Sequence, residues 1–275
     1  MRDFTAQQNL SNRMGALVRF LEHIKRDGTG MLIVSEMNRD PPDNAVLVDV
    51  IAKHGYALIA KGIKNEQSDK SFGTFIFARS DWNNYTAVTF AIRAGEDERD
   101  VNRVPMVTIG QFCVIGFHGT LDVRSPDRLN QELEALANVQ CYDRTKVVVG
   151  DANLICELAD QYCKRDRNLV PSGLCTFAGW PTDRLNADAV RWFAQHRPSM
   201  LFDTDRCLTP LDMVWVDGPA RATVKVLNPS TFEPFDSFEQ QLAYANNMPP
   251  ATETISDHFP LSVVISHTTP CEKGE

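Results

Sequence analysis

The sequence contains no long hydrophobic run and no paired-cysteine motif, and these absences exclude several classes of protein. No apolar run approaches the roughly 20 residues that span a bilayer, which excludes an integral membrane protein. The first residues, MRDFTAQQNLSNR, contain no apolar secretory core, so we expect an intracellular protein, cytoplasmic or nuclear. The seven cysteines show neither a CxxC pair nor zinc-ligand spacing, which favours mostly reduced thiols.

Positive charge is also scarce, because the formal net charge of the chain is −8. Binding along a nucleic-acid backbone depends on Lys and Arg side chains that neutralise phosphates, so a long basic track is not expected. An enzyme that holds one phosphate through a bound cation is still allowed, because an acidic pocket filled by Mg²⁺ is locally positive.

The chain shows no internal repeat, no low-complexity segment and no long linker, and its 275 residues are enough to bury a large core. Hydrophobic periodicity predicts helices over 12–24 (capped by Ser11 or Asn12), from 125 onward, over 186–196 and over 238–246. Strands are predicted over 31–36, 73–79, 87–92, 106–110, 112–119, 146–150, 211–216 and 260–266. We expect one domain over 1–268, with a long loop excursion at 217–255 and a short polar tail at 269–275.

The order of these elements predicts the fold class. Many strands with few helices, and helices that lie between groups of strands, favour an α/β fold in which sheet packs on sheet and helices lie outside. A doubly wound parallel sheet would need a helix between nearly every pair of strands, and the region 73–119 contains none.

Five of the predicted apolar strands carry an acid, an amide or an imidazole at one end. In chain order these residues are Glu36, His118, Asp151, Asn153, Asp212, Asp257 and His258, and the hydroxyl of Ser256 precedes the last two. Charged groups are costly inside a fold unless they are paired or bound to a metal. Several strand ends that share this pattern therefore suggest convergence on one site.

Each of these residues also has a structural explanation when it is taken alone. Glu36 could form a surface ion pair, His118 could be structural, and Gly-Asp-Ala-Asn at 150–153 is a common turn sequence. Cys113, on an apolar strand, is most simply a core residue. Taken together and in chain order, the set favours a site.

The ordered set resembles the signature of the endonuclease/exonuclease/phosphatase family, which are Mg²⁺-dependent phosphoesterases. That signature combines an early Asn, a Glu that ends the next strand, a central His, a GDxN turn, a late Asp and a terminal SDHxP. The matching residues are Asn9 in QQNLSNR, Glu36 in IVSEMN, His118 in GFHGT, Asp151 and Asn153 in GDANL, Asp212 in LDMVWV, and Ser256, Asp257 and His258 in SDHFPL. The resemblance spans residues 9–266 and implies a DNase I-like four-layer α/β sandwich, with two central, mainly antiparallel sheets flanked by helices.

The resemblance implies a metal site and a set of catalytic groups. Glu36 would be the main ligand of Mg²⁺, with Mn²⁺ as a substitute, because a carboxylate suits a hard cation. Asn9 would hold that metal or the phosphate beside it, and Asp257 could join the metal shell.

The implied catalytic groups act on water and phosphate. Asp151 would orient or deprotonate the attacking water, and Asn153 would donate to a non-bridging phosphate oxygen. His258 would donate to the phosphate while Asp212 fixes its tautomer, and His118 would steady the transition state from the other side.

Three positions depart from the pattern of the abasic-site endonucleases. Ser11 stands where many nucleases have an Asp, Phe72 replaces a tyrosine, and Gly119 follows the central His in place of Leu. The central His and the GDANL form instead resemble the branch that holds tyrosyl-DNA phosphodiesterase 2 and the sphingomyelinases.

The substrate is predicted from the same branch. Arg103, expected just before a strand, is a candidate substrate contact, as are Trp180 and Ser256, although such residues could equally belong to the surface or the core. We expect a Mg²⁺-dependent phosphodiesterase that acts on nucleic acid or on a nucleic-acid adduct. The alternatives are a soluble phosphatase of inositol phosphates or another small phosphoester, and a non-catalytic binding protein with the same fold.

Overall fold

A computed structural model gives the arrangement of most of the chain. It describes residues 2–38, 43–63, 72–93, 101–119, 126–151, 176–177, 201–203, 207–208, 212–217, 220–237, 240, 243–244 and 260–267. The helix predicted over 186–196 lies outside these residues. Within the described ranges, no helix is long and apolar enough to cross a membrane.

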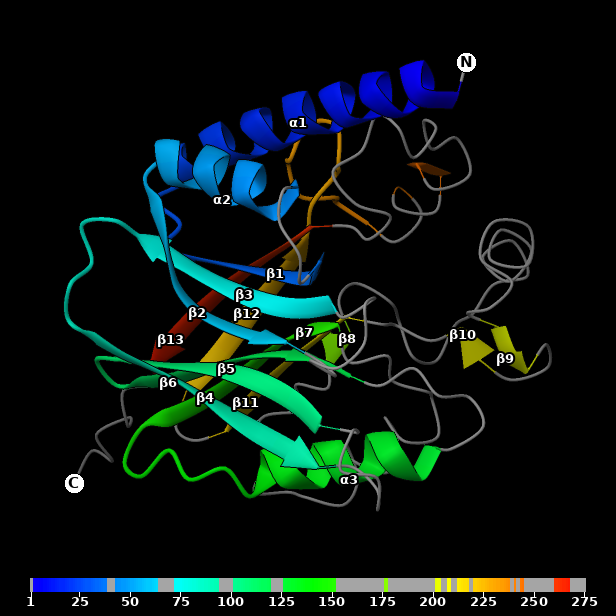
Figure 1. Cartoon of the computed structure of the whole chain (residues 1–275). Helices are drawn as coiled ribbons and strands as arrows, with labels where there is room; N and C mark the ends of the chain where they lie inside the picture. Colours follow the sequence, from blue (N-terminus) through cyan, green and yellow to red (C-terminus); the bar gives the residue numbers. More distant parts are fainter. Residues whose placement is uncertain are drawn as a thin grey trace.

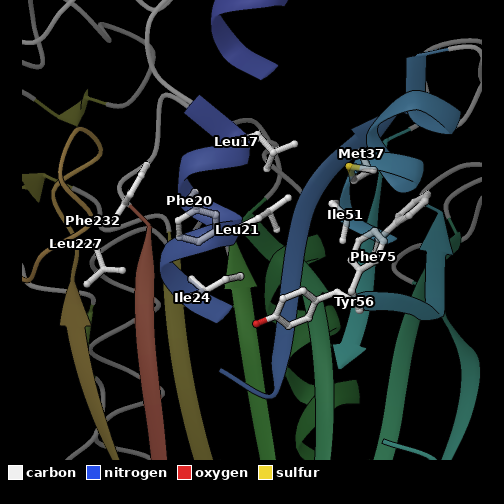
Figure 2. Packing of buried hydrophobic residues seen from close by; sticks show 11 residues of the cluster. Leu17, Phe20, Leu21, Ile24, Met37, Ile51, Tyr56, Phe75, Leu227 and Phe232 are labelled. Carbon is white, nitrogen blue, oxygen red and sulfur yellow. The ribbon is translucent and has the colours of Figure 1, made fainter. Parts of the chain in front are cut away.

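Two helices and a three-stranded antiparallel sheet form one half of the molecule. The helices are α1 (Arg2–Arg26) and α2 (Asp43–Lys53), and the strands are β1 (Met31–Asn38), β2 (Tyr56–Ile63) and β3 (Phe72–Arg79), in the order β1-β3-β2. Leu17, Phe20, Leu21 and Ile24 recur at helical spacing on α1, so one face of that helix is apolar. This face packs with residues of α2, β2 and β3 in one buried cluster (Figure 2).

A six-stranded sheet forms the other half. Its strands are β4 (Tyr85–Arg93), β5 (Val101–Ile109), β6 (Phe112–His118), β7 (Thr145–Asp151), β8 (Thr176–Phe177) and β11 (Asp212–Asp217), in the order β4-β5-β6-β7-β11-β8. Only β6 and β7 run parallel; the other neighbours are antiparallel. Helix α3 (Pro126–Ala137) covers one face of this sheet, where its Leu133 and Leu136 pack with Ile115, Phe117 and Val148.

The two sheets pack face to face at Gly116 of β6. A Cβ atom at Gly116 would lie 2.8 Å from Cγ2 of Thr74 and 3.3 Å from Cγ1 of Ile76, both on β3, so only glycine allows this approach. The layers therefore run from α1 and α2, through the two sheets, to α3 (Figure 1). This is the predicted four-layer α/β sandwich.

Two short ribbons complete the described strands. β9 (Leu201–Asp203) pairs with β10 (Cys207–Leu208), and β12 (Ala220–Val226) pairs with β13 (Leu261–His267), both antiparallel. Ala220 and Ala222 of β12 pack on Val147 of β7 and on Val214 and Val216 of β11. The β12–β13 ribbon therefore covers the six-stranded sheet close to β7.

Several boundaries differ from those predicted. Helix α1 begins at Arg2, so Ser11 and Asn12 lie inside it and do not cap its start. The excursion predicted at 217–255 contains strand β12, because the alternation of ARATVKV was hidden by the polar residues that follow it. The description of 1–268 as one domain remains a prediction.

The chain after β12 is anchored on α1 through Phe232. Its side chain is buried although its backbone φ is 62°, a conformation that bulky residues rarely adopt. The ring of Phe232 lies 5.3 Å from the ring of Phe20, at an interplanar angle of 62° (Figure 2). Burial of this ring against α1 offsets the backbone strain and fixes the turn at residues 227–237.

The cysteines differ in part from the expectation of mostly reduced thiols. Cys113 of β6 is fully buried, as predicted for a core residue. It is joined by a disulfide to Cys141, which follows α3. Both belong to the cluster between α3 and the six-stranded sheet.

Candidate active site

Three of the predicted site residues lie in one row across neighbouring strands. The parallel ladder of β6 and β7 pairs His118 with Asp151. The antiparallel ladder of β7 and β11 pairs Asp151 with Asp212. Two strands that end at this row and one strand that begins there thus bring together residues far apart in the sequence.

Gly150 makes the close approach of β6 and β7 possible beside the row. Its φ is 149°, a region that side chains with a Cβ rarely adopt. A Cβ at Gly150 would overlap the carbonyl oxygen of Phe117 and lie 3.0 Å from the carbonyl carbon. One residue further along, the amide of Gly119 donates to the carbonyl of Asp151 at 2.7 Å. The glycine of the GDAN motif therefore sets the spacing between the backbones that carry His118 and Asp151.

The side chains of His118 and Asp151 are both withdrawn from solvent. Asp151 is 3% exposed, and its Oδ2 lies 3.8 Å from Nε2 of His118. This distance is too long for a hydrogen bond but short enough for a charge interaction. A carboxylate this deeply buried requires compensation by a cation or by hydrogen bonds, and a protonated His118 would supply part of it.

Sequence reasoning missed two buried polar residues behind His118. The amide nitrogen Nδ2 of Asn102, on β5, donates to the carbonyl of His118 at 2.9 Å and to Oε1 of Glu132 at 3.1 Å. Glu132 lies on α3 and is 1% exposed. Neither residue stands at the end of an apolar run, so the strand-end pattern could not reveal them.

Glu36 lies on β1 at a break in the strand register. The pairing of β1 with β3 shifts between Val34 and Met37, which places Glu36 in a β-bulge. Bulges are frequent beside active sites because they change the direction in which side chains point. Strand β1 also contacts β6 and β7, the two strands that carry His118 and Asp151. The side chain of Glu36 lies outside the described part of the structure.

The other predicted residues divide into described and undescribed positions. Asn9 lies within helix α1. The side chains of Asn9 and Asp212 lie outside the described part of the structure. Arg103 is exposed and lies within β5, opposite Ala91 of β4, so the expectation that it precedes a strand was wrong. The remaining predicted residues, Asn153, Trp180, Ser256, Asp257 and His258, lie outside the described residues.

The predicted metal ligands have the chemistry that Mg²⁺ requires. The predicted ligands Asn9, Glu36 and Asp257 all offer oxygen atoms, and the buried carboxylate of Asp151 lies in the same region as the strand of Glu36. Among the described side chains, no group of three or more His, Cys, Asp or Glu residues could hold a metal ion. The residue types therefore fit the metal, and the ligand set remains a prediction.

In its overall fold the chain is similar to solved structures of endonuclease/exonuclease/phosphatase proteins. Solved structures with this fold include a family member from Leptotrichia buccalis, with a TM-score of 0.58 and 15% identity over 93% of this chain and 94% of that chain. A second is D. rerio TDP2 humanized by 14 mutations, with a TM-score of 0.54 and 15% identity over 94% of this chain and 92% of that chain.

A third solved structure, ANGEL2, has a TM-score of 0.54 and 15% identity over 90% of this chain and 84% of that chain. No protein-family model and no curated protein sequence matches the chain. At these identities the likeness establishes the fold, which confirms the fold that the resemblance implied.

Proposed function

We propose that the protein is a Mg²⁺-dependent phosphodiesterase that hydrolyses phosphoester bonds in nucleic acid or in a nucleic-acid adduct. The observation that carries the proposal is the row of His118, Asp151 and Asp212 on β6, β7 and β11. These residues were selected from the sequence as a site, and strand register makes them neighbours. A structural role for each residue separately would not require that coincidence.

The chain's own groups supply acid–base chemistry in this proposal. Asp151 orients an attacking water molecule and accepts its proton, because its carboxylate stands at the end of β7 beside His118. His118, beside it, compensates negative charge that develops on the phosphate. Asn9, Glu36 and Asp257 would hold the Mg²⁺, which supplies Lewis-acid activation and charge neutralisation when bound.

The substrate class is supported by what two similar structures contain. D. rerio TDP2, with a TM-score of 0.52 and 15% identity to this chain, is complexed with a single-strand DNA product. ANGEL2, a 2′,3′-cyclic phosphatase, is in complex with adenosine-2′,3′-vanadate. Both ligands are nucleotides with a phosphate group or a phosphate analogue. We therefore propose nucleic acid as the substrate in preference to inositol phosphates. The intracellular location remains a prediction.

The first experiment measures metal-dependent hydrolysis by the purified chain. The substrates are single-stranded and duplex DNA, RNA, a 5′-phosphotyrosyl oligonucleotide, a 2′,3′-cyclic nucleotide and an inositol polyphosphate, each with Mg²⁺, Mn²⁺ or a chelator. Release from a nucleotide substrate that the chelator abolishes is expected. Release from the inositol polyphosphate alone would favour the small-phosphoester alternative. Absence of release from every substrate would contradict an enzymatic role on this panel.

Two pairs of variants test the site. Asp151→Asn should lower kcat by about 10²–10⁴-fold, because it removes the proposed base. Asp143→Asn is its control, since that carboxylate precedes the same strand but is 94% exposed. His118→Gln should also lower kcat, whereas His54→Gln, which changes a histidine bonded to the carbonyl of Val50 on α2, should not. Equal activities within each pair would show that the site is misplaced.

A further inference from the structure

The end of β6 that carries His118 extends past its backbone ladder with β5. That ladder pairs Ile109 with Phe112 and ends where Met106 pairs with Ile115. The next residue of β5 is Pro105, which has no amide hydrogen to donate. The described register between the two strands therefore ends before His118.

The side chain of Asn102 connects β5 to β6 beyond that ladder. Asn102 is 5% exposed, and its Nδ2 donates to the carbonyl of His118 at 2.9 Å. The same nitrogen donates to Oε1 of the buried Glu132 at 3.1 Å, which ties the bond to helix α3. An amide with both N–H groups engaged has a fixed orientation, so the carbonyl of His118 is held at a defined position.

His118 is thereby fixed from both sides. On one side β7 holds it through the parallel register and the bond from Gly119 to Asp151. On the other side Asn102 holds its carbonyl. We propose that Asn102 is a positioning residue that sets the placement of the His118 imidazole relative to Asp151. This inference rests on the proposed function, because it gives His118 a role in the reaction.

The matched control is Lys146, a second buried polar residue that anchors the same helix. Lys146 lies on β7, and its Nζ donates to the carbonyl of Ala137 at 2.7 Å and to that of Leu136 at 3.3 Å. Both Asn102 and Lys146 thus tie α3 to the sheet, but the described bonds of Lys146 go to the end of α3 and not to His118. Lys146→Met tests the loss of an anchor of α3 without loss of the bond to His118.

The kinetic test compares Asn102→Ala with Lys146→Met at a temperature where both are folded. Asn102→Ala should lower kcat by about 10- to 100-fold with KM changed less than about twofold, since small displacements of a catalytic group cost this much. Lys146→Met should keep kcat within about twofold of wild type. An unchanged kcat for Asn102→Ala, or equal losses in the two variants, would overturn the proposal. If Asn102→Ala does not fold, Asn102→Ser replaces it, because serine keeps a polar group but is too short for the bond.

A second readout does not depend on activity. The imidazole ¹⁵N resonances of His118, assigned by their loss in His118→Gln, are followed by NMR over a pH titration. Asn102→Ala should shift these resonances and their titration midpoint, and Lys146→Met should leave both in place. If the wild type hydrolyses no substrate, the proposed function fails while this shift still supports positioning. Unshifted His118 resonances in Asn102→Ala would refute positioning whatever the activity.

Discussion

The close approach of β6 and β7 at Gly150 leads to a quantitative prediction for Gly150→Ala. A residue with a Cβ at a φ of 149° costs about 1–3 kcal/mol in backbone strain. Overlap of that Cβ with the carbonyl of Phe117 adds about 1–3 kcal/mol, because backbone on both sides must move. We therefore expect Gly150→Ala to lower the free energy of unfolding by about 4 kcal/mol, the middle of the summed range.

The control for this prediction is Gly110→Ala, at the turn between β5 and β6. Gly110 also has a positive φ, 53°, but a Cβ there would meet no atom within 4 Å. Gly110→Ala should lower the free energy of unfolding by about 1–2 kcal/mol, which is the penalty of the left-handed conformation alone. Urea unfolding followed by circular dichroism measures both free energies. The difference between the two variants isolates the contact between the strands.

The site should respond to the same substitution. Gly150→Ala displaces the strand ends that hold His118 and Asp151, so kcat should fall with the stability, whereas Gly110→Ala, at the other end of β6, should retain activity. If the two variants were equally stable within about 1 kcal/mol, the spacing of β6 and β7 would not depend on this glycine. Gly150 would then have no special role in holding His118 beside Asp151.

Three further substitutions have definite expected outcomes. Tyr56→Phe should cost about 1 kcal/mol through the lost bond to the carbonyl of Thr29. Burial raises the pKa of Tyr56, although Arg79 opposes the shift. The contribution of this hydrogen bond to the free energy of unfolding should therefore be complete below about pH 10 and be lost at higher pH, as urea unfolding at each pH would measure. Lys146→Met should cost about 1–3 kcal/mol in the same assay, because α3 loses the ammonium bonded to its last carbonyls. The side-chain hydrogen bond from Arg79 lowers the pKa of Asp81, so any Tm deficit of Asp81→Asn at pH 7 should vanish once acid protonates that carboxyl. A deficit that persisted after the Asp81 carboxyl has been fully protonated would contradict this origin.

The strands were predictable where apolar runs are uninterrupted, and less so elsewhere. The runs that became β3 and β7 are mostly buried along their length, that of β1 is largely half-buried, and all three read directly as strands. Helix α2 and strand β2 were missed, because Asp43–Lys53 and Tyr56–Ile63 mix apolar and polar residues, although Gly55, with a φ of 93°, makes the turn between them. Their tertiary contacts with the cluster under α1 stabilise them, and no local pattern reports such contacts.

The site was predictable to the extent that its residues stand at strand ends. His118 and Asp151 end their strands, whereas Asp212 begins its strand, so the three meet only if β6 and β7 are parallel and β11 is reversed. Strand direction is not encoded in any of the three motifs. It follows from α3, which carries the chain from the end of β6 back to the start of β7 as a crossover between parallel strands needs. The same helix places Glu132 behind Asn102. One crossover therefore accounts both for the row that the sequence suggested and for the buried support that it could not reveal.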